Sequence, residues 1–300
     1  MDYLNFYSLS EKISIRRQNE IEKKDLLKQK NVLYIFLFIF QNMIVTKENN
    51  PFFFKTRKIS ENFLGLSLSF IASHDSETFI LCNLNENLFK NSKTFKKCNI
   101  VSIRDAFFGL GQKYSSLLSS GYSLYKWQIN NNFCSKCGSK TIYDDYGNSI
   151  KCLNKSCNNK IFPNVFPTII VNVTHKNFIL LARNKGWKEN LYSCLAGFCE
   201  QNESAEESAR REVYEEVGLE LQEINYKYSQ YWPFSSNLML GFEAKIKSNK
   251  INIEVNKKEI EEARWFTSIE IKNLQKKKEL ILPNKEAIAF SLIKDWLKKN

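Results

Sequence analysis

Three glutamates in one short stretch are the side chains whose types and spacing could do chemistry together. In residues 197–219, GFCEQNESAEESARREVYEEVGL, Glu212, Glu215 and Glu216 are spaced three and four residues apart. Side chains at this spacing share one face of a helix, so their like charges repel one another. Clustered carboxylate oxygens are ligands for hard cations such as Mg²⁺ or Mn²⁺, which also bridge to substrate phosphates. The stretch therefore predicts a divalent-metal site for phosphate chemistry.

A helix must position these carboxylates. Ser204 and Glu207 form a capping box that predicts its start, and Gly218 is typical of its end. Apolar residues recur every four positions and form one stripe: Ala205, Ala209, Val213 and Val217. Arg211 can reach back toward Glu203, so we expect it to hold the preceding loop against the helix.

The whole stretch resembles the Nudix box, GX5EX7REUXEEXGU with U aliphatic, which is the signature of Nudix hydrolases. Every fixed position is matched: Gly197, Glu203, Arg211, Glu212, Val213, Glu215, Glu216, Gly218 and Leu219. The alternative is a solvated acidic face on an ordinary amphipathic helix, which does not explain matches in register. Asn202 stands where relatives usually carry glycine, and asparagine tolerates the positive φ that such a turn needs. The resemblance implies cleavage of a nucleoside diphosphate linked to another moiety.

Four cysteines ahead of this stretch have the spacing of a metal site. Cys134 and Cys137 form a CxxC pair followed by Gly138, and Cys152 and Cys157 form a Cx4C pair. Four thiolates in such a pattern would bind one Zn²⁺ tetrahedrally. No further ligand is offered, so the zinc would be structural and would fold a short ribbon. A redox dithiol and a chance spacing are the alternatives.

A third motif follows the helix. Residues 229–239, SQYWPFSSNLM, resemble the SQPWPFPxS array of NADH pyrophosphatases, with departures at Tyr231, Ser235 and Asn237. Trp232 and Phe234, held stiff by the proline between them, could sandwich a nicotinamide or adenine ring. They could also be ordinary core aromatics. Two of the departures remove prolines, which leaves the substrate preference open.

Together these motifs resemble the NADH pyrophosphatase (NAD diphosphatase) family of zinc-ribbon Nudix hydrolases. Phe63-Leu64-Gly65 and Ala287-Ile288-Ala289 extend the resemblance, which covers about residue 31 to the end. It implies an NAD(+)/NADH diphosphatase that hydrolyses NAD(H) to NMN(H) and AMP, with removal of NAD caps from RNA as a second activity. It also implies a homodimer, two to three catalytic Mg²⁺ or Mn²⁺ ions per site and one structural Zn²⁺ per subunit.

The same resemblance implies roles for individual residues. The catalytic metal ligands would be Glu212, Glu216, Glu259 and the backbone carbonyl of Ala196, while Glu215 would be an outer ligand or a base. Glu203 and Arg211 would support the loop and helix. The residues lining the nucleotide would be Gln230, Tyr231, Trp232, Pro233, Phe234, Ser235, Ser236, Asn237 and Ala289.

Two other functions fit parts of the sequence. One is a Nudix hydrolase for another dinucleotide or a nucleotide sugar. The other is a zinc-ribbon protein that binds nucleic acid and carries an inactive Nudix fold, which would use the net charge of +12. Against the second, the metal-binding glutamates are complete and the ribbon sequence shows no clear aromatic-plus-basic stripe. A general bias toward lysine also explains the charge.

The length of 300 residues favours two or three domains. We expect an α+β fold, a Nudix α/β/α sandwich with a mixed sheet, preceded by a zinc ribbon and a small mainly β domain. The expected boundaries are 1–30 for an N-terminal extension, 31–128 for a NADH-pyrophosphatase-like N-terminal domain with a helical linker, 129–163 for the zinc ribbon and 164–300 for the Nudix domain.

Apolar and helical periodicities predict the elements inside these domains. They give two helices in residues 104–128 broken near 119–121, a hairpin turning at 175–177, and a third strand at 191–194. Strands at 222–229, 238–246 and 259–267 and helices at 268–275 and 287–297 follow.

The sequence favours a cytoplasmic protein without a membrane partner. Its longest apolar run, Val32 to Phe40, is shorter than the roughly 20 residues that a membrane helix needs. The N-terminus lacks a signal-peptide pattern. Four cysteines have metal spacing and the other four look unpaired, as expected in a reducing compartment.

Overall fold

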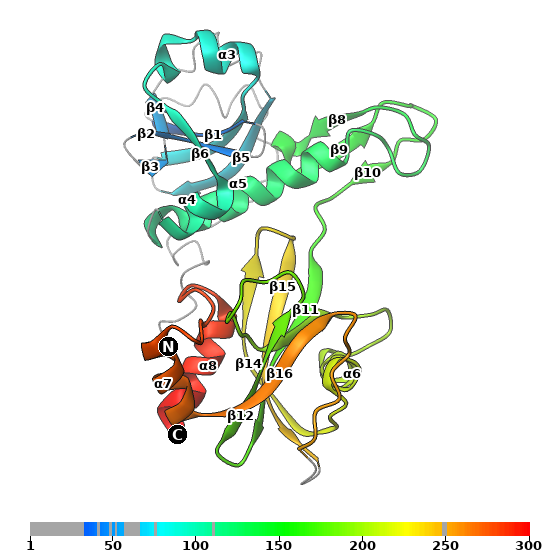
Figure 1. Cartoon of the computed structure of the whole chain (residues 1–300). Coiled ribbons are helices and arrows are strands. Elements are labelled where there is room, and N and C mark those ends of the chain that lie inside the picture. Colours follow the sequence, from blue (N-terminus) through cyan, green and yellow to red (C-terminus); the bar gives the residue numbers. More distant parts are fainter. Residues whose placement is uncertain are drawn as a thin grey trace. The chain divides into compact units, whose positions relative to one another are not determined.

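The computed structural model describes residues 33–40, 43–47, 50–51, 53–56, 67–74, 77–109, 112–247 and 251–300. These residues form two compact units, one ending at Asn164 and one running from Val165 to Asn300 (Figure 1). The extension predicted at 1–30 and the Phe63-Leu64-Gly65 motif lie outside the described residues. None of the helices within the described ranges is long and apolar enough to cross a membrane.

The first unit begins with a mixed sheet of short strands. Its elements are β1 (Leu33–Phe40), β2 (Met43–Lys47), β3 (Asn50–Pro51), β4 (Phe53–Thr56), β5 (Ser67–His74), β6 (Glu77–Asn83) and β7 (Asn99–Ser102). The strand order is β3-β2-β1-β6-β5, with β4 paired to β1 and β7 paired to β2. Helix α3 (Glu86–Asn91) and the 3₁₀ turn η1 (Lys93–Phe95) lie between β6 and β7. Strand β1 therefore lies within the longest apolar run of the sequence, Val32 to Phe40.

Two helices follow, but the predicted break between them was wrong. Helix α4 (Ile103–Gly109) ends before α5 (Gln112–Asn130) begins, and α5 runs through residues 119–121 without interruption. A Cβ atom on Gly121 would lie 2.6 Å from Cδ2 of Leu37 in β1. Close packing of the helix on the sheet therefore explains the glycine. In the sequence alone, the same glycine resembles the end of a helix.

A three-stranded ribbon completes the first unit. It consists of β8 (Thr141–Asp144), the 3₁₀ turn η2 (Asp145–Gly147), β9 (Ser149–Cys152) and β10 (Lys160–Ile161), in the order β10-β9-β8. Nε2 of Gln128 in α5 donates hydrogen bonds of 2.8 Å to Oγ of Ser69 and to the carbonyl of Gly147. Helix α5 thus ties the ribbon to the first sheet.

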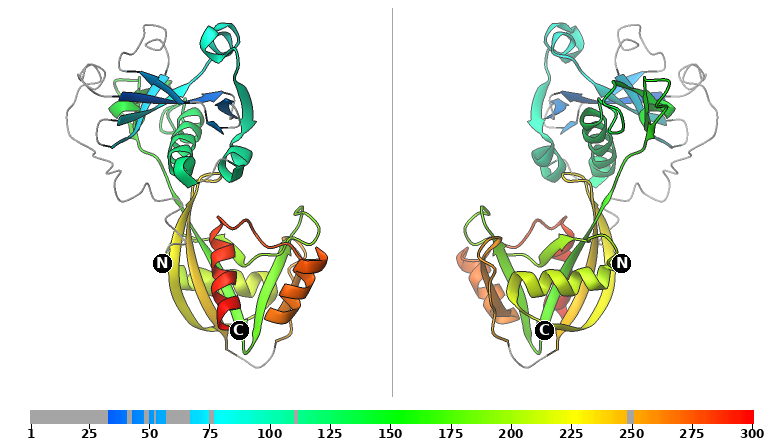
Figure 2. Two further views of the ribbon diagram at one scale, coloured as in Figure 1. Left: turned by 90° about the vertical axis from the view of Figure 1, so that its left-hand side faces the viewer. Right: turned by 90° about the vertical axis from the view of Figure 1, so that its right-hand side faces the viewer.

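The second unit is an α/β/α sandwich. Its mixed sheet has the order β14-β15-β11-β12-β16, with β13 paired to β11. The strands are β11 (Phe166–His175), β12 (Phe178–Asn184), β13 (Leu195–Phe198), β14 (Leu221–Trp232), β15 (Asn237–Ile246) and β16 (Ile260–Thr267). Helix α6 (Ala205–Val217) covers one face, and α7 (Ser268–Lys277) and α8 (Ile288–Lys299) cover the other (Figure 2).

The alternation of side chains along β11 explains both layers. Ile169 packs in the core beneath α6, with Val213 as a partner, whereas the next residue, Ile170, packs in the core beneath α7 and α8. The expected α+β fold with a Nudix sandwich is confirmed, as is the hairpin that turns after His175.

The third strand of this unit starts later than predicted. Residues 191–194 form only isolated bridges, between Ser193 and Ala182 and between Leu191 and Ile281, and β13 begins at Leu195. The backbone N–H of Tyr192 donates to the carbonyl of Ile281, which lies between α7 and α8, at 3.0 Å. This segment is therefore held partly by a distant loop, which local β propensity does not reveal.

Candidate active site

Helix α6 begins and ends as its sequence predicts. The hydroxyl of Ser204 accepts from the backbone N–H of Glu207 at 3.2 Å, and the Glu207 carboxylate accepts from the backbone N–H of Ser204 at 2.7 Å. Gly218 closes the helix in the left-handed conformation, with φ of 71°. Ala209 and Val213 are fully buried against the sheet, so the opposite flanks of the helix carry the charged residues.

Arg211 joins the loop before α6 to the helix. Its Nε donates to Oε1 of Glu203 at 2.6 Å, and its Nη2 donates to Oε2 of Glu203 at 2.9 Å and to the carbonyl of Phe198 at 2.8 Å. Hydrogen bonds from Arg211, and next from Ser208, lower the pKa of Glu203 to about 2. Asn202 has the expected positive φ, 70°. The predicted support of the loop by this ion pair is present.

Glu212 lies directly on the backbone of β13. A Cβ atom on Gly197 would sit 1.9 Å from Cδ of Glu212, so only glycine leaves room for the carboxylate. Nη1 of Arg211 holds Oε1 of Glu212 at 2.9 Å. Ala196, the residue before Gly197, pairs with Ile170 of β11. The fold therefore places the carboxylate of Glu212, which belongs to α6, against the strand that contains the other predicted ligand, Ala196.

Glu216 is the most unusual carboxylate of the site. Its side chain is buried, with 3% of the residue exposed, and its Oε2 has no hydrogen-bond partner among the described residues. Burial, followed by the charges of Glu212, Glu259 and Glu215, raises its pKa to about 8. A buried carboxylate without a partner is costly. A divalent cation between these side chains would remove that cost, so the residues fit a hard metal ion.

Glu259 comes from the turn before β16, far from α6 in the sequence. The backbone N–H of Asn256 donates to the carbonyl of Glu216 at 2.9 Å, which binds this turn to the end of α6. Burial raises the pKa of Glu212, and against the opposing effect of Arg211 the charges of Glu215 and then Glu259 raise it further. The fold thus brings Glu259 within electrostatic reach of the half-buried Glu212 and the buried Glu216. Asn256 lies outside every motif in the sequence, and no local pattern indicates its role.

Glu215 differs from the other two helix glutamates. Its side chain is 54% exposed, and its Oε2 accepts from Nη1 of Arg211 at 3.1 Å. It therefore lies at the rim, whereas Glu212 is half-buried, Glu216 is buried, and the exposed Glu259 is near enough for its charge to raise the pKa of both.

The four ribbon cysteines form a separate cluster. Their sulfur atoms all lie within 4.8 Å of one another, with 3.5 Å between Cys137 and Cys152 and 3.9 Å between Cys134 and Cys157. Sulfur atoms at Zn–S distances of about 2.3 Å in a tetrahedron lie about 3.8 Å apart. Hydrogen bonds from Ser139 lower the pKa of Cys137 to about 6, whereas burial raises the pKa of Cys152 to about 12, so a bound cation would have to favour the thiolate form there. The cluster fits one tetrahedral metal ion, and none of its cysteines forms a disulfide.

The two aromatic rings that were predicted to bind the substrate pack against each other. The rings of Trp232 and Phe234 lie 5.0 Å apart, centre to centre, with 76° between their planes. This edge-to-face arrangement leaves no parallel slot between them. Tyr231 and Ser236 are partly exposed, Ser235 is exposed, and Pro233 is buried.

Three of the predicted substrate residues are engaged inside the protein. Nε2 of Gln230 donates to the carbonyl of Glu286 at 2.8 Å, and its Oε1 accepts from the backbone N–H of Ile288 at 2.7 Å. Nδ2 of Asn237 donates to Oγ1 of Thr168 at 2.6 Å. Ala289 is buried in the core beneath α8. Gln230 thus fixes the segment that leads into α8.

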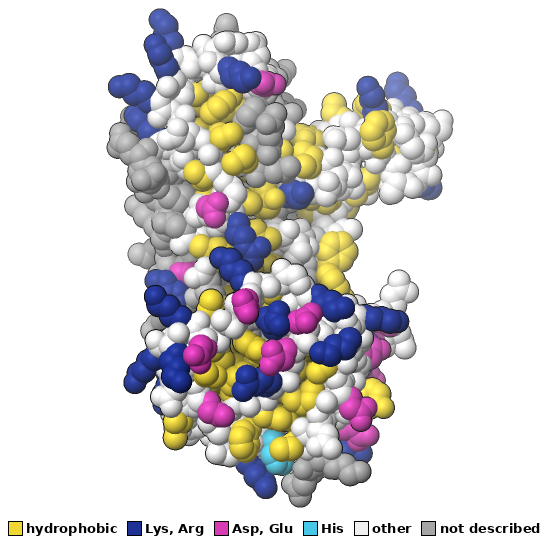
Figure 3. Space-filling model, viewed as in Figure 1, with side chains coloured by type: hydrophobic (Ala, Val, Ile, Leu, Met, Phe, Trp, Pro, Cys, Tyr) yellow, Lys and Arg dark blue, Asp and Glu magenta, His cyan; other side chains and the backbone are white. Residues whose placement is uncertain are grey.

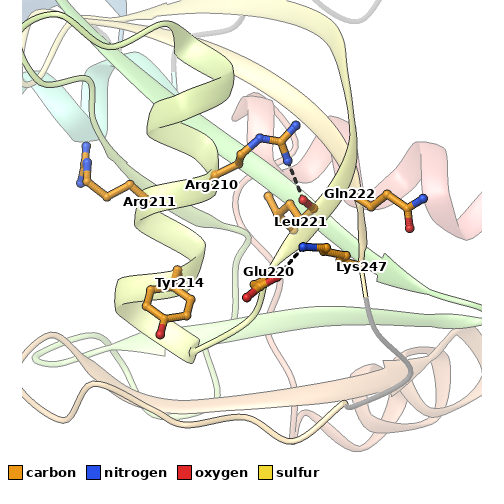
Figure 4. Close-up of a pocket in the computed structure, with 7 residues that line it drawn as sticks. All are labelled: Arg210, Arg211, Tyr214, Glu220, Leu221, Gln222 and Lys247. Carbon is orange, nitrogen blue, oxygen red and sulfur yellow. Dashed lines mark hydrogen bonds and ion pairs between the residues drawn. The ribbon is translucent and has the colours of Figure 1, made fainter.

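A surface pocket of about 710 Å³ lies beside α6 but contains none of the buried carboxylates. Its lining is Arg210, Arg211, Tyr214, Glu220, Leu221, Gln222 and Lys247 (Figure 4). Arg210 donates to the carbonyl of Leu221 at 2.5 Å, and Lys247 lies 3.2 Å from Glu220. The one carboxylate in its lining, Glu220, is thus paired with a lysine, so the pocket does not offer the ligands of a metal site.

Comparison with known proteins agrees with this site. The model of the NUDIX domain matches residues 163–285. The chain is 37% identical over 219 residues to human "NAD(P)H pyrophosphatase NUDT13, mitochondrial", covering 69% of this chain and 62% of that protein. It is 34% identical over 206 residues to human "NAD-capped RNA hydrolase NUDT12", covering 65% and 44%. Against "NAD-capped RNA hydrolase NudC" of Mannheimia succiniciproducens it is 36% identical over 169 residues, covering 55% and 62%. The matches span less than two thirds of each relative.

Proposed function

This chain belongs to the Nudix hydrolases, and from that premise we propose that it hydrolyses the pyrophosphate bond of NAD(H) to give NMN(H) and AMP. The observation that supports this most is the buried carboxylate of Glu216, which has an unpaired oxygen and a pKa raised by burial and by the charges of Glu212 and Glu259. Carboxylates arranged in this way can bind divalent cations, which in turn bind the phosphates of a substrate. Relatives that are named for NAD(P)H and NAD-capped RNA support the choice of substrate.

Glu212, Glu216, Glu259 and the carbonyl of Ala196 would hold two to three Mg²⁺ or Mn²⁺ ions. Bound there, the ions would polarise phosphoryl oxygens and lower the pKa of the attacking water. Glu203 and Arg211 keep the loop and helix in place, and Glu215, at the exposed rim, is the candidate outer ligand or base. The four ribbon cysteines would hold one structural Zn²⁺ per subunit.

The aromatic pair suggests how a flat ring would bind. Because Trp232 and Phe234 touch edge to face, a nicotinamide or adenine ring could enter between them only after they separate. Stacking on an outer ring face requires no such movement. We therefore infer that the partly exposed rings supply a stacking surface near the substrate, together with Tyr231, Ser235 and Ser236.

NAD-capped RNA is the second candidate substrate, since it contains the same bond and since the net charge of +12 favours a polyanion. A homodimer and a cytoplasmic location remain predictions, to be checked by sedimentation and by cell fractionation. Other dinucleotides and nucleotide sugars would be separated from NAD(H) by a product assay on a substrate panel.

The first experiment mixes the purified protein with NADH and either Mg²⁺ or Mn²⁺ and separates the products by chromatography. We expect AMP and NMNH from the wild type and a loss of several orders of magnitude in turnover for Glu216→Gln. No product from a folded sample that retains its zinc would contradict the proposed substrate. Equal activity of the variant would contradict the proposed site.

A further inference from the structure

One face of the cysteine ribbon is exposed to solvent and carries lysine and apolar side chains in rows. Strand register pairs Lys151 with Lys160 on one side and with Ile142 on the other. Paired residues on adjacent antiparallel strands point to the same face, so these three form a row. On the other face, Ile150 and Cys152 are buried.

A second row runs parallel to the first. Lys140, two residues before Ile142, accepts a hydrogen bond of 3.0 Å from the backbone of Leu153 and forms a bridge with Phe133. A step of two residues along a strand returns to the same face. We call Phe133, Lys140, Ile142, Lys151, Leu153 and Lys160 the ribbon face.

The apolar members of the ribbon face are largely exposed. Exposure reaches 62% for Phe133, 54% for Ile142 and 55% for Leu153. Phe162, which is 56% exposed, extends the face, because Nζ of Lys160 lies 5.6 Å from its ring centre. Hydrophobic and lysine side chains lie together over this part of the molecule, at the upper right of Figure 3. Contiguous apolar exposure of this kind marks an interaction surface.

Charge decides between two possible occupants of the ribbon face. Residues 131–164 contain five lysines and two aspartates. Lys160 pairs with Asp144 at 2.9 Å, whereas Lys140 and Lys151 make no ion pair with any residue that the structure describes. A second copy docked through the same face would set lysines against lysines. A polyanion with flat apolar groups suits the face better.

We propose that the ribbon face binds the single-stranded RNA that follows the cap of an NAD-capped substrate, an inference that rests on the proposed function. Bases would stack on Phe133 and Phe162, and phosphates would meet Lys140 and Lys151. Duplex RNA hides its bases, so it would bind more weakly. In the sequence these residues are spread over positions 133–162 and form no stripe; the strand register brings them together.

The test measures binding of a fluorescein-labelled, uncapped, single-stranded RNA of about 20 nucleotides to the full chain by anisotropy. Lys140→Gln combined with Lys151→Gln is compared with Lys276→Gln combined with Lys277→Gln, two exposed lysines in the last turn of α7. Both variants lose the same charge. For the ribbon variant, the slope of log affinity against log salt should fall by about 1.4, and affinity should drop about 25-fold at 0.1 M salt.

The α7 variant should bind RNA like the wild type, and Phe133→Ala should weaken binding about tenfold. NADH hydrolysis should be the same in all of these proteins. If the wild type does not hydrolyse NADH but the ribbon variant still binds RNA more weakly, the proposed reaction is wrong, while RNA binding by the ribbon face is supported. The inference is overturned if the wild type does not bind RNA or if the two double variants bind equally. It is also overturned if the ribbon variant changes only the sedimentation of the protein, which would assign the face to a second copy.

Discussion

Replacing Gly197 by alanine tests whether the position of the Glu212 carboxylate, and not merely its presence, supports catalysis. The added Cβ would lie 1.9 Å from Cδ of Glu212, and ordinary contact requires at least 3.4 Å. The carboxylate must therefore move by about 1.5 Å. A displacement of about 1 Å in a catalytic site can cost about 100-fold in rate. We expect kcat/KM for NADH to fall at least 100-fold, or about 2.7 kcal/mol of transition-state stabilisation.

The backbone itself should tolerate the change, because Gly197 is a strand residue paired with Ile169 and does not have a positive φ. Thermal unfolding followed by circular dichroism should therefore show an intact fold. The assay is steady-state release of AMP from NADH by Gly197→Ala, Glu212→Gln and the double variant. If alanine acts only through Glu212, the double variant should be no slower than Glu212→Gln.

Two results would refute this reasoning. Wild-type kinetics for Gly197→Ala would show that the Glu212 carboxylate can move without consequence. Fully additive losses in the double variant would show that Gly197 contributes through something other than Glu212.

Three further predictions concern Glu216, the ribbon and Gln230. Because the pKa of Glu216 is raised, the folded state keeps a proton that the unfolded state releases at about pH 4.5. Without Mg²⁺ or Mn²⁺, the free energy of unfolding should therefore fall as the pH rises from about 4.5 to about 8. Urea titrations should show that Glu216→Gln removes this dependence, and an unchanged pH profile would contradict it. Cys152→Ser should lower both the melting temperature and the zinc content, measured by mass spectrometry; a full zinc atom per chain would contradict the four-cysteine site. Gln230→Leu leaves the carbonyl of Glu286 and the N–H of Ile288 unpaired, at about 1–3 kcal/mol each. Urea unfolding of the unliganded variant measures this loss, and unchanged stability with an altered KM would assign Gln230 to the substrate instead.

Local features of the fold were predictable from the sequence. The capping box at Ser204 and the stop at Gly218 set the ends of α6, because both depend on neighbours a few residues away. The hairpin after His175 follows from alternating strands and a short polar turn. The helix break near residue 120 was wrong, since Gly121 serves contact with a distant strand.

The candidate site divides in the same way. The sequence by itself determined the family signature, the helix that carries the glutamates and the four-cysteine pattern, because each is written in short-range spacing. Only the tertiary structure decided that Glu216 is buried with an unpaired oxygen within electrostatic reach of Glu259, that Glu212 rests on Gly197, and that the lysines and apolar side chains of the ribbon share one exposed face. Burial and strand register depend on which distant segments pack together, and no local pattern specifies them.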